Sequence, residues 1–246
     1  MDKLDFCKKL DCALLENIGC ALTDRQKEQM FFLAERLVEV NKVMNLTAIV
    51  DEDGIILRHI TDSLFISSFI GNGESIIDVG CGAGFPSLPL AILRPDIKIL
   101  ALDSTEKRIR YVEETACLLG LNNVIAVAAR AEEAAALPQY RESFDHATAR
   151  AVASLPTLCE LTLPFVKIGG TLIAMKAKDA QCELDSSKTA ITTLAGEAAW
   201  NSAAVNAATL SGFGISEGRA IITIKKHSPT PSLYPRRFGQ IKKAPL

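Results

Sequence analysis

The stretch "DVGCGAGFPSLPLAI", residues 78–92, decides the fold of this chain. An apolar run that includes Asp78 leads into three alternating glycines, Gly80, Gly82 and Gly84, and a second apolar run follows them. This pattern is typical of a buried strand, a tight turn and a helix, and turns of this kind often hold nucleotide-like ligands. The G-x-G-x-G spacing differs from the G-x-G-x-x-G of dinucleotide-binding loops, so the stretch alone leaves the ligand open.

Short apolar segments alternate with helical segments from residue 75 onward, which predicts a mostly parallel sheet with helices on both faces. Strands are expected at 75–80, 98–103, 123–129, 144–150, 169–176, 203–210 and 219–226. Helices are expected at 87–93, 105–119, 131–136, 153–165 and 179–200. The last two strands are joined by a short turn around residues 211–214 and should be antiparallel. The fold class is therefore α/β, Rossmann-like, with seven strands and an antiparallel last strand.

The first 74 residues are predicted to be helical. Thr23 and Gln26 form a capping box at the start of one helix, and the acidic residues from Asp51 begin a second helix that continues through Leu64. We therefore divide the chain into an N-terminal helical extension packed on the main domain (1–74), a Rossmann-like domain (75–227) and a basic C-terminal tail (228–246).

Candidate site residues lie where the predicted strands end, because ligands of open α/β sheets bind beyond the carboxyl ends of the strands. Asp103 ends the second strand, where a carboxylate can accept both hydroxyls of a ribose or can simply cap the next helix. The loop after the third strand is expected beside a nucleobase, with backbone contact from Ala131 or Glu132. Arg150 ends the fourth strand and either contacts a carboxylate or phosphate, or forms a surface ion pair.

His59, Asp62 and Ser63 share one predicted helix and raise the alternative of a hydrolase. A G-x-S-x-G nucleophile elbow is missing from the sequence, and no segment is predicted to supply an oxyanion hole. A structural histidine–aspartate pair is the favoured interpretation.

Composition narrows the class of protein. The seven cysteines are scattered singly, which suggests neither a zinc site nor a disulfide framework. The sequence shows neither a secretory signal nor an apolar run near the roughly 20 residues that a membrane span needs. We expect a cytoplasmic protein that binds no metal and no membrane.

The charge is unevenly distributed along the chain. A formal net charge of -2 argues against nonspecific coating of nucleic acid. Residues 225–246 nevertheless hold six Lys or Arg and no acidic residue. The tail is interpreted either as a solvated terminus or as an arm that contacts RNA phosphates, with the candidate RNA-binding residues Arg236, Arg237, Lys242 and Lys243.

The glycine loop, the acid that ends the second strand and the antiparallel last strand together resemble the class I S-adenosylmethionine-dependent methyltransferases. Seven further motifs are similar, in order and spacing, to the bacterial RsmG/GidB family: NLTAI (45–49), RHITDSL (58–64), LDSTEKR (102–108), RAEE (130–133), ARAVASL (149–155), MKAK (175–178) and YPRRFGQIKKAPL (234–246). The resemblance covers about residues 20–246. It implies a 16S ribosomal RNA guanine-N7 methyltransferase that uses S-adenosylmethionine, acts on 16S RNA or the small subunit, and is expected to be a monomer.

The family's cofactor contacts carry over by position to Gly80, Phe85, Ala131 with Glu132, and Arg150. Asp103 carries over from the wider class, and Gly82 and Gly84 are added as the other glycines of the loop. The resulting cofactor-binding set is Gly80, Gly82, Gly84, Phe85, Asp103, Ala131, Glu132 and Arg150. A catalytic residue cannot be assigned, since guanine N7 has a free lone pair and its methylation needs no proton removed. The Ala-Arg-Ala that ends the fourth strand fits a ring-nitrogen target, in contrast to the Asn-Pro-Pro-Tyr of exocyclic-amine methylases.

The chain departs from the family pattern at Ser87 and Ala177, where the family usually has Gly. Ser87 is expected to cap the first helix of the main domain, whereas Ala177 puts in doubt the local geometry after the fifth strand. Two other functions stay open at this point: a nicotinamide-dependent oxidoreductase and a noncatalytic RNA-binding assembly factor.

Overall fold

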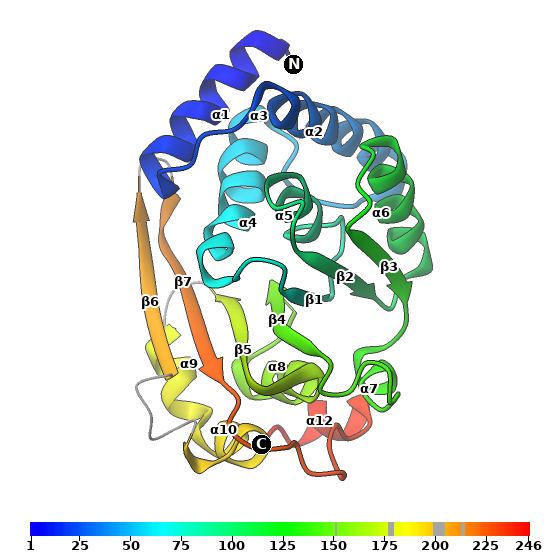
Figure 1. Ribbon diagram of the computed structural model, residues 1–246, viewed down its shortest axis with the longest axis vertical. Coiled ribbons are helices and arrows are strands. Elements are labelled where there is room, and N and C mark those ends of the chain that lie inside the picture. The colour runs from blue at the N-terminus through cyan, green and yellow to red at the C-terminus, as the bar shows by residue number, and fades with distance from the viewer. Residues whose placement is uncertain (151, 177–179, 199–204, 213–214) are drawn as a thin grey trace.

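The computed structural model describes residues 1–150, 152–176, 180–198, 205–212 and 215–246 (Figure 1). The departure at Ala177 therefore lies outside the described residues, as do the expected turn positions 213–214 and parts of the segments expected at 179–200 and 203–210.

One seven-stranded sheet with the order β3-β2-β1-β4-β5-β7-β6 forms the centre of the molecule. Its strands are β1 (Ser75–Val79), β2 (Lys98–Asp103), β3 (Val124–Ala128), β4 (Phe144–Arg150), β5 (Val166–Lys176), β6 (Val205–Gly212) and β7 (Ile215–Lys225). The first five strands are parallel, and β7 runs antiparallel to both β5 and β6. The predicted fold class is confirmed, including the antiparallel final pair.

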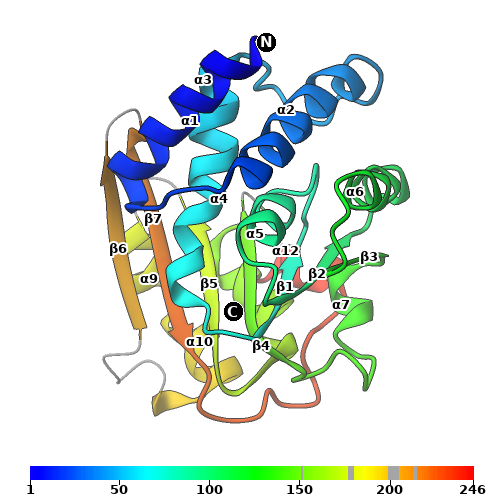
Figure 2. The ribbon, with the colours of Figure 1, turned by 45° about the horizontal axis from the view of Figure 1, so that its top comes forward.

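Helices cover both faces of the sheet (Figures 1 and 2). One face carries α1 (Lys3–Ile18), α2 (Asp24–Met44), α5 (Ser87–Leu93) and α6 (Glu106–Leu118), and the other carries α7 (Ala131–Ala134), α8 (Leu155–Thr162), α9 (Ala180–Ser186) and α10 (Lys188–Ala195). Ile76 packs into the first hydrophobic core and Ile77 into the second, as the two-residue period of a strand requires. A short helix, α12 (Phe238–Lys243), ends the chain below the sheet.

The N-terminal helices begin where capping residues stand. Thr23 and Gln26 form the predicted capping box at the start of α2. The expected helix from Asp51 to Leu64 is present as α3 (Glu52–Gly54), a π-helical segment η1 (Ile55–Thr61) and α4 (Asp62–Leu64), and a 3₁₀ segment, η2 (Phe65–Phe69), follows. π-helical turns occur frequently at functional sites. This one presents His59 toward the carboxyl end of the sheet.

Several elements differ from their predicted bounds; β7, for example, begins at Ile215 rather than at residue 219. Strand β5 begins at Val166 rather than at residue 169, because Gly169 and Gly170 lie within the strand, where its pairing with β4 shifts register. Within the described residues, the helix expected at 179–200 is divided at Ser187, between α9 and α10, and the Ser187 hydroxyl donates to the carbonyl of Glu183 at 2.6 Å. Within the described part of the chain, no helix combines the length and apolar character needed to cross a bilayer.

Candidate functional site

The loop after β1 has a backbone that only glycine adopts easily. Gly80 and Gly82 have φ angles of +78° and +58°. A Cβ added to Gly80 would lie 2.7 Å from a methyl carbon of Val152, so a side chain there would clash across the mouth of the loop. Gly84, with φ of +82°, is required for another reason, since an added Cβ would lie 2.6 Å from Leu88 in the core. The loop therefore packs against Val152 at Gly80 and leaves room beside Gly82, where an added Cβ would meet only the Gly80 carbonyl oxygen at 4.0 Å.

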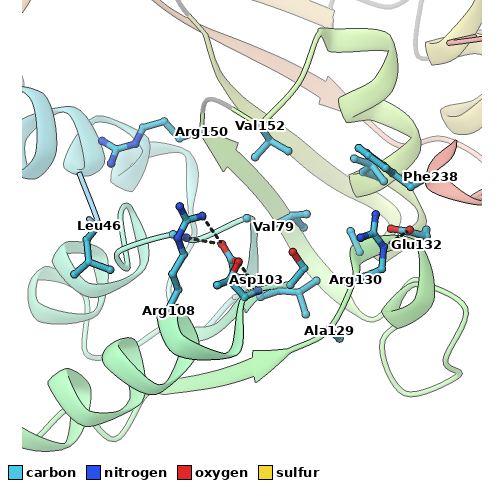
Figure 3. Close-up of a pocket in the computed structure, with 17 residues that line it drawn as sticks. Leu46, Val79, Asp103, Arg108, Ala129, Arg130, Glu132, Arg150, Val152 and Phe238 are labelled. Carbon is cyan, nitrogen blue, oxygen red and sulfur yellow. Dashed lines mark hydrogen bonds and ion pairs between the residues drawn. The ribbon is translucent and has the colours of Figure 1, made fainter. Parts of the chain in front are cut away.

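That room is part of a cleft of about 510 Å³ at the carboxyl ends of β1 to β4, where the strand order reverses (Figure 3). Its volume is in the range of small-molecule sites. Six predicted residues line it: Gly80, Gly82, Asp103, Ala131, Glu132 and Arg150. Gly84 and Phe85 lie outside its lining. The other lining residues were not predicted from sequence, and they include Leu46, Arg108, Val152 and Phe238.

Asp103 links the two loops that form the floor of the cleft. Its side chain is 7% exposed. One carboxylate oxygen accepts the Gly82 N–H at 3.0 Å, and the other accepts the Thr105 N–H at 2.8 Å. The N-cap of α6 is Thr105, so the cap alternative for Asp103 does not describe its position. A carboxylate has about four lone-pair sites, so Asp103 can still accept hydrogen bonds from a ligand.

The loop after β3 forms the opposite side of the cleft. The Ala129 N–H donates to the Asp103 carbonyl at 3.1 Å, which ties this loop to the end of β2. Glu132 is paired with Arg130 Nε at 2.7 Å, and the Arg130 guanidinium lies 5.0 Å from the centre of the Phe238 ring. The carboxylate of Glu132 is thus already engaged, which favours the backbone of Ala131 and Glu132 as the group facing a ligand.

Arg150 lies on the far side of the cleft from Phe238 (Figure 3). Its guanidinium is 3.2 Å from a carboxylate oxygen of the buried Asp62 and donates to the Arg58 carbonyl at 3.0 Å. Arg219 of β7 contacts the other oxygen of Asp62 at 3.5 Å. Arg150 therefore does form an ion pair, one of its two alternatives, but the pair is buried at the edge of the cleft instead of lying on the surface, and it fixes the Arg150 side chain.

His59 joins this cluster as a neutral imidazole. Arg150 lies 3.3 Å from its Nδ1 and can only donate, so Nδ1 is the acceptor and Nε2–H donates to the Thr47 hydroxyl at 2.9 Å. Phe85 stacks on the imidazole, with ring centres 4.7 Å apart, which places Phe85 behind the cleft wall. The motifs NLTAI, RHITDSL and ARAVASL therefore meet in one polar cluster.

The same contacts exclude a hydrolase triad. The Ser63 hydroxyl donates to the backbone carbonyl of His59, one helical turn earlier, at 2.5 Å. The imidazole is bonded to Thr47 and Arg150 instead of Ser63. His59, Asp62 and Ser63 are structural neighbours of the cleft.

Ser87 does not cap a helix, contrary to the sequence prediction. Pro86 occupies the N-cap position of α5 and makes no side-chain cap bond. The Ser87 hydroxyl instead donates to Asp78 Oδ2 at 2.5 Å, and both side chains are buried. The other oxygen of Asp78 has no hydrogen-bond partner among the described residues. A glycine at position 87 would leave this buried carboxylate without its side-chain donor.

Asp78 and His59 are expected to act oppositely on stability between pH 4 and pH 6.5. Burial raises the pKa of Asp78 to about 6, so its contribution to stability falls as the pH rises toward 6. Burial and the neighbouring arginines lower the pKa of His59 to about 4, so its contribution rises as the pH rises from 4 to 6.5. Urea unfolding at several pH values should therefore give a steeper increase of stability with pH for Asp78→Asn than for wild type, and a shallower increase for His59→Asn. Equal slopes for the three proteins would contradict these assignments.

The C-terminal tail is folded against the domain. Lys226 is fully buried, and the Nη2 of Arg236 lies 2.6 Å from Glu160, whose side chain is 0% exposed. Arg236 also donates from its Nε and its backbone N–H to Glu160, each at 2.8 Å. Because these groups satisfy a buried carboxylate, Arg236 is removed from the candidate RNA contacts. Arg237, Lys242 and Lys243 are exposed and remain candidates.

Strand order, the glycine loop after β1 and the carboxylate at the end of β2 define this protein as an S-adenosylmethionine-dependent methyltransferase of Rossmann-like fold. Solved structures show the same fold. A SAM-dependent O-methyltransferase from Thermotoga maritima matches with a TM-score of 0.53 and 16% identity, covering 79% of this chain and 73% of that one. P. horikoshii TYW2, solved with MeSAdo, matches with a TM-score of 0.52 and 15% identity, covering 68% of this chain and 61% of that one.

The chain belongs to the rRNA small subunit methyltransferase G family (GidB), whose sequence profile matches residues 26–207. Ribosomal RNA small subunit methyltransferase G of Geobacillus kaustophilus is 44% identical over 236 residues, which covers 95% of this chain and 96% of the relative. The protein of the same name from Leuconostoc citreum is 42% identical over 241 residues, covering 94% and 96%. The family inferred from the linked motifs is thereby confirmed.

Proposed function

We propose that this enzyme transfers a methyl group from S-adenosylmethionine to N7 of a guanine in 16S small-subunit ribosomal RNA. The proposal rests on the position of Asp103 on the floor of a cleft of small-molecule size. The Asp103 carboxylate accepts hydrogen bonds from Gly82 in the glycine loop and from Thr105 at the start of α6, and so holds these two segments together. Family membership supplies the RNA substrate class. Both alternatives from the sequence, an oxidoreductase and a noncatalytic assembly factor, lack a comparable observation.

The residues of the cleft fit the proposed cofactor. The space beside Gly82, where an added Cβ would meet only the Gly80 carbonyl oxygen at 4.0 Å, allows a ligand to approach the backbone closely. We propose that Asp103 accepts the ribose hydroxyls, that the backbone of Ala131 and Glu132 faces the adenine, and that Arg150 borders the amino-acid end. Gly82 belongs to the same loop. Gly84 and Phe85 support the loop from outside the cleft, through packing against Leu88 and His59. The bound sulfonium supplies the methyl group.

The proposed reaction needs position rather than acid–base chemistry. Guanine N7 carries an in-plane lone pair, so attack on the methyl group requires no proton removal and no covalent adduct with the protein. The pair formed by Asp62 and Arg150 keeps one wall of the cleft rigid and polar. Val152 and Leu46 provide apolar surface at the mouth, where an aromatic base can be accommodated.

We also propose the division into a helical extension (1–74), a Rossmann-like domain (75–227) and a C-terminal segment (228–246), together with a monomeric, cytoplasmic state. Residues of α1, α2 and α5 share one hydrophobic core, which supports an extension packed on the domain. Size-exclusion chromatography with light scattering tests the monomer directly.

Arg237, Lys242 and Lys243 are expected to contact RNA phosphates. Replacing all three by Ala should weaken RNA binding and lower the salt slope of log K by about 2, because each phosphate contact on single-stranded nucleic acid contributes roughly 0.7. Binding measured by fluorescence anisotropy at several salt concentrations gives the slope. Lys8→Ala combined with Arg25→Ala removes exposed charge from α1 and α2 instead and should leave it unchanged. An unaltered slope in the triple variant would make the tail a merely solvated terminus.

The proposed function is tested by incubating the protein with labelled S-adenosylmethionine and small subunits, assembly intermediates or 16S RNA from cells that lack the gene. Label should enter the RNA. A protein that binds S-adenosylhomocysteine but transfers no label to any of these substrates would contradict the proposal. A Gly82→Asp variant, built to block the cleft, is the negative control, and unchanged function of this variant in cells would favour the assembly-factor alternative.

A further inference from the structure

The C-terminal strap, residues 226–246, follows a path over the domain that is fixed by buried charges. Lys226 begins it with a side chain that is 0% exposed. Its ammonium donates to Glu142 at 2.7 Å and to the carbonyls of Leu163 and Val166, each at 2.9 Å. All three donors of the ammonium are thus satisfied, as a buried lysine requires.

Two arginines hold the rest of the strap. Arg141 donates to the carbonyls of Thr230, Pro231 and Tyr234 at 2.7, 3.3 and 2.9 Å. Farther along, Arg236 donates from Nε and Nη2 to the two carboxylate oxygens of the buried Glu160. It also donates to the Ala244 carbonyl at 3.0 Å. Three charged side chains, those of Lys226, Arg141 and Arg236, thus fix about twenty residues to the domain. A solvated terminus would not need these contacts, so we ask which side chain of the strap they hold in position.

Phe238 is the residue that the strap brings to the cleft. It is the first residue of α12, two positions after Arg236, and it lines the same cleft as Gly80 and Asp103. Its ring faces the Arg130 guanidinium at 5.0 Å, and Arg130 is paired with Glu132 (Figure 3). These three side chains form a stack at the β3 end of the cleft, beside the loop expected to face the nucleobase.

We infer that Phe238 is a cofactor-binding residue that closes the adenine end of the cleft, and that the strap positions it there. This inference rests on the proposed assignment of the cleft to S-adenosylmethionine. Asp103 marks the proposed ribose position, and Arg130, Glu132 and Phe238 lie together on the side of Asp103 away from Arg150 (Figure 3). The ring is 36% exposed, so it has surface left for a ligand. A purine beside it would gain an aromatic contact in addition to apolar burial.

Phe238→Ala tests the inference by isothermal titration calorimetry. We expect the Kd for S-adenosylhomocysteine to rise about threefold to tenfold. The Kd for 5′-methylthioadenosine, which has the adenosine but lacks the amino-acid chain, should rise by the same factor. Phe238→Tyr should stay near the wild-type value. Leu233→Ala removes another exposed apolar side chain of the strap and should have no effect on either Kd.

Three results would overturn the inference: a wild-type Kd for Phe238→Ala, a loss seen with S-adenosylhomocysteine but absent with 5′-methylthioadenosine, or a Tyr variant as weak as the Ala variant. Melting of each variant without ligand shows whether the fold is intact. A wild-type protein that bound neither ligand would overturn the proposed function as well. Equal binding of both ligands by wild type and by Phe238→Ala would overturn only the role of Phe238. If Phe238→Ala lowered the affinity for RNA alone, Phe238 would be a residue that stacks on RNA and not on the cofactor.

Discussion

Asp103→Asn is expected to raise the Kd for S-adenosylhomocysteine by about 10- to 100-fold, the loss typical of hydrogen bonds made to a charged group. The asparagine has the same shape, but its amide nitrogen can only donate, so one of the two acceptor atoms of Asp103 is lost. The Gly82 and Thr105 N–H groups, which now donate to different oxygens of the carboxylate, would compete for one acceptor. A ribose would also face a weaker acceptor. Both the shape of the glycine loop and the direct contact are therefore affected.

Calorimetry with S-adenosylhomocysteine measures this effect. Glu106→Gln is the matched control, because it removes a neighbouring carboxylate at the start of α6, where Glu106 is exposed and paired only with Arg110 among the described residues. Its Kd should equal that of wild type. A similar loss in both variants would point to general electrostatics, and no loss in Asp103→Asn would exclude the proposed ribose contact.

Arg236→Ala is expected to lower the free energy of unfolding by about 3–5 kcal/mol, as for other buried ion pairs that lose one partner. Glu160 is 0% exposed, and Arg236 supplies its hydrogen bonds from Nε, Nη2 and the backbone. The backbone bond can survive the substitution, but the carboxylate would lose its compensating charge. The strap would detach from α8 to let water reach Glu160.

Urea unfolding of Arg236→Ala and of Arg237→Ala measures this prediction, because Arg237 is the adjacent arginine and is exposed. The Arg237 variant should stay within about 0.5 kcal/mol of wild type. Glu160→Gln added to Arg236→Ala should restore part of the loss, since it removes the unpaired buried charge. Equal stability of the two single variants would show that the Arg236–Glu160 pair does not anchor the strap.

The sheet was predictable because buried parallel strands are nearly continuous apolar runs bounded by turn residues. The expected bounds of β2 and β4 agree with the structure to the residue. Misplaced bounds follow from tertiary effects. Gly169 and Gly170 look like a break in the sequence, but pairing with β4 draws them into β5 as an irregularity. Ser187 divides a helix that is continuous in periodicity, through a bond to Glu183.

The cleft was partly predictable, since strand ends alone locate Gly80, Asp103 and Arg150. The strap was not, because its partners lie far away in the sequence. A run of basic residues is usually a solvated surface, and nothing local marks Glu142 or Glu160 as the acids that bind it. Arg236 precedes Phe238 by two positions, but this spacing in the sequence does not predict that Phe238 lines the cleft. Only the folded contacts separate Arg236 from its exposed neighbour Arg237.

The most direct test of the proposed reaction is the chemical identity of the methylated nucleoside. RNA labelled by the enzyme from S-adenosylmethionine is digested to nucleosides and separated by chromatography with mass detection. We predict that the label elutes as 7-methylguanosine for wild type, and that this labelled peak is strongly reduced for Asp103→Asn. Label in any other nucleoside, or RNA that stays unlabelled although the protein binds the cofactor, would contradict the account.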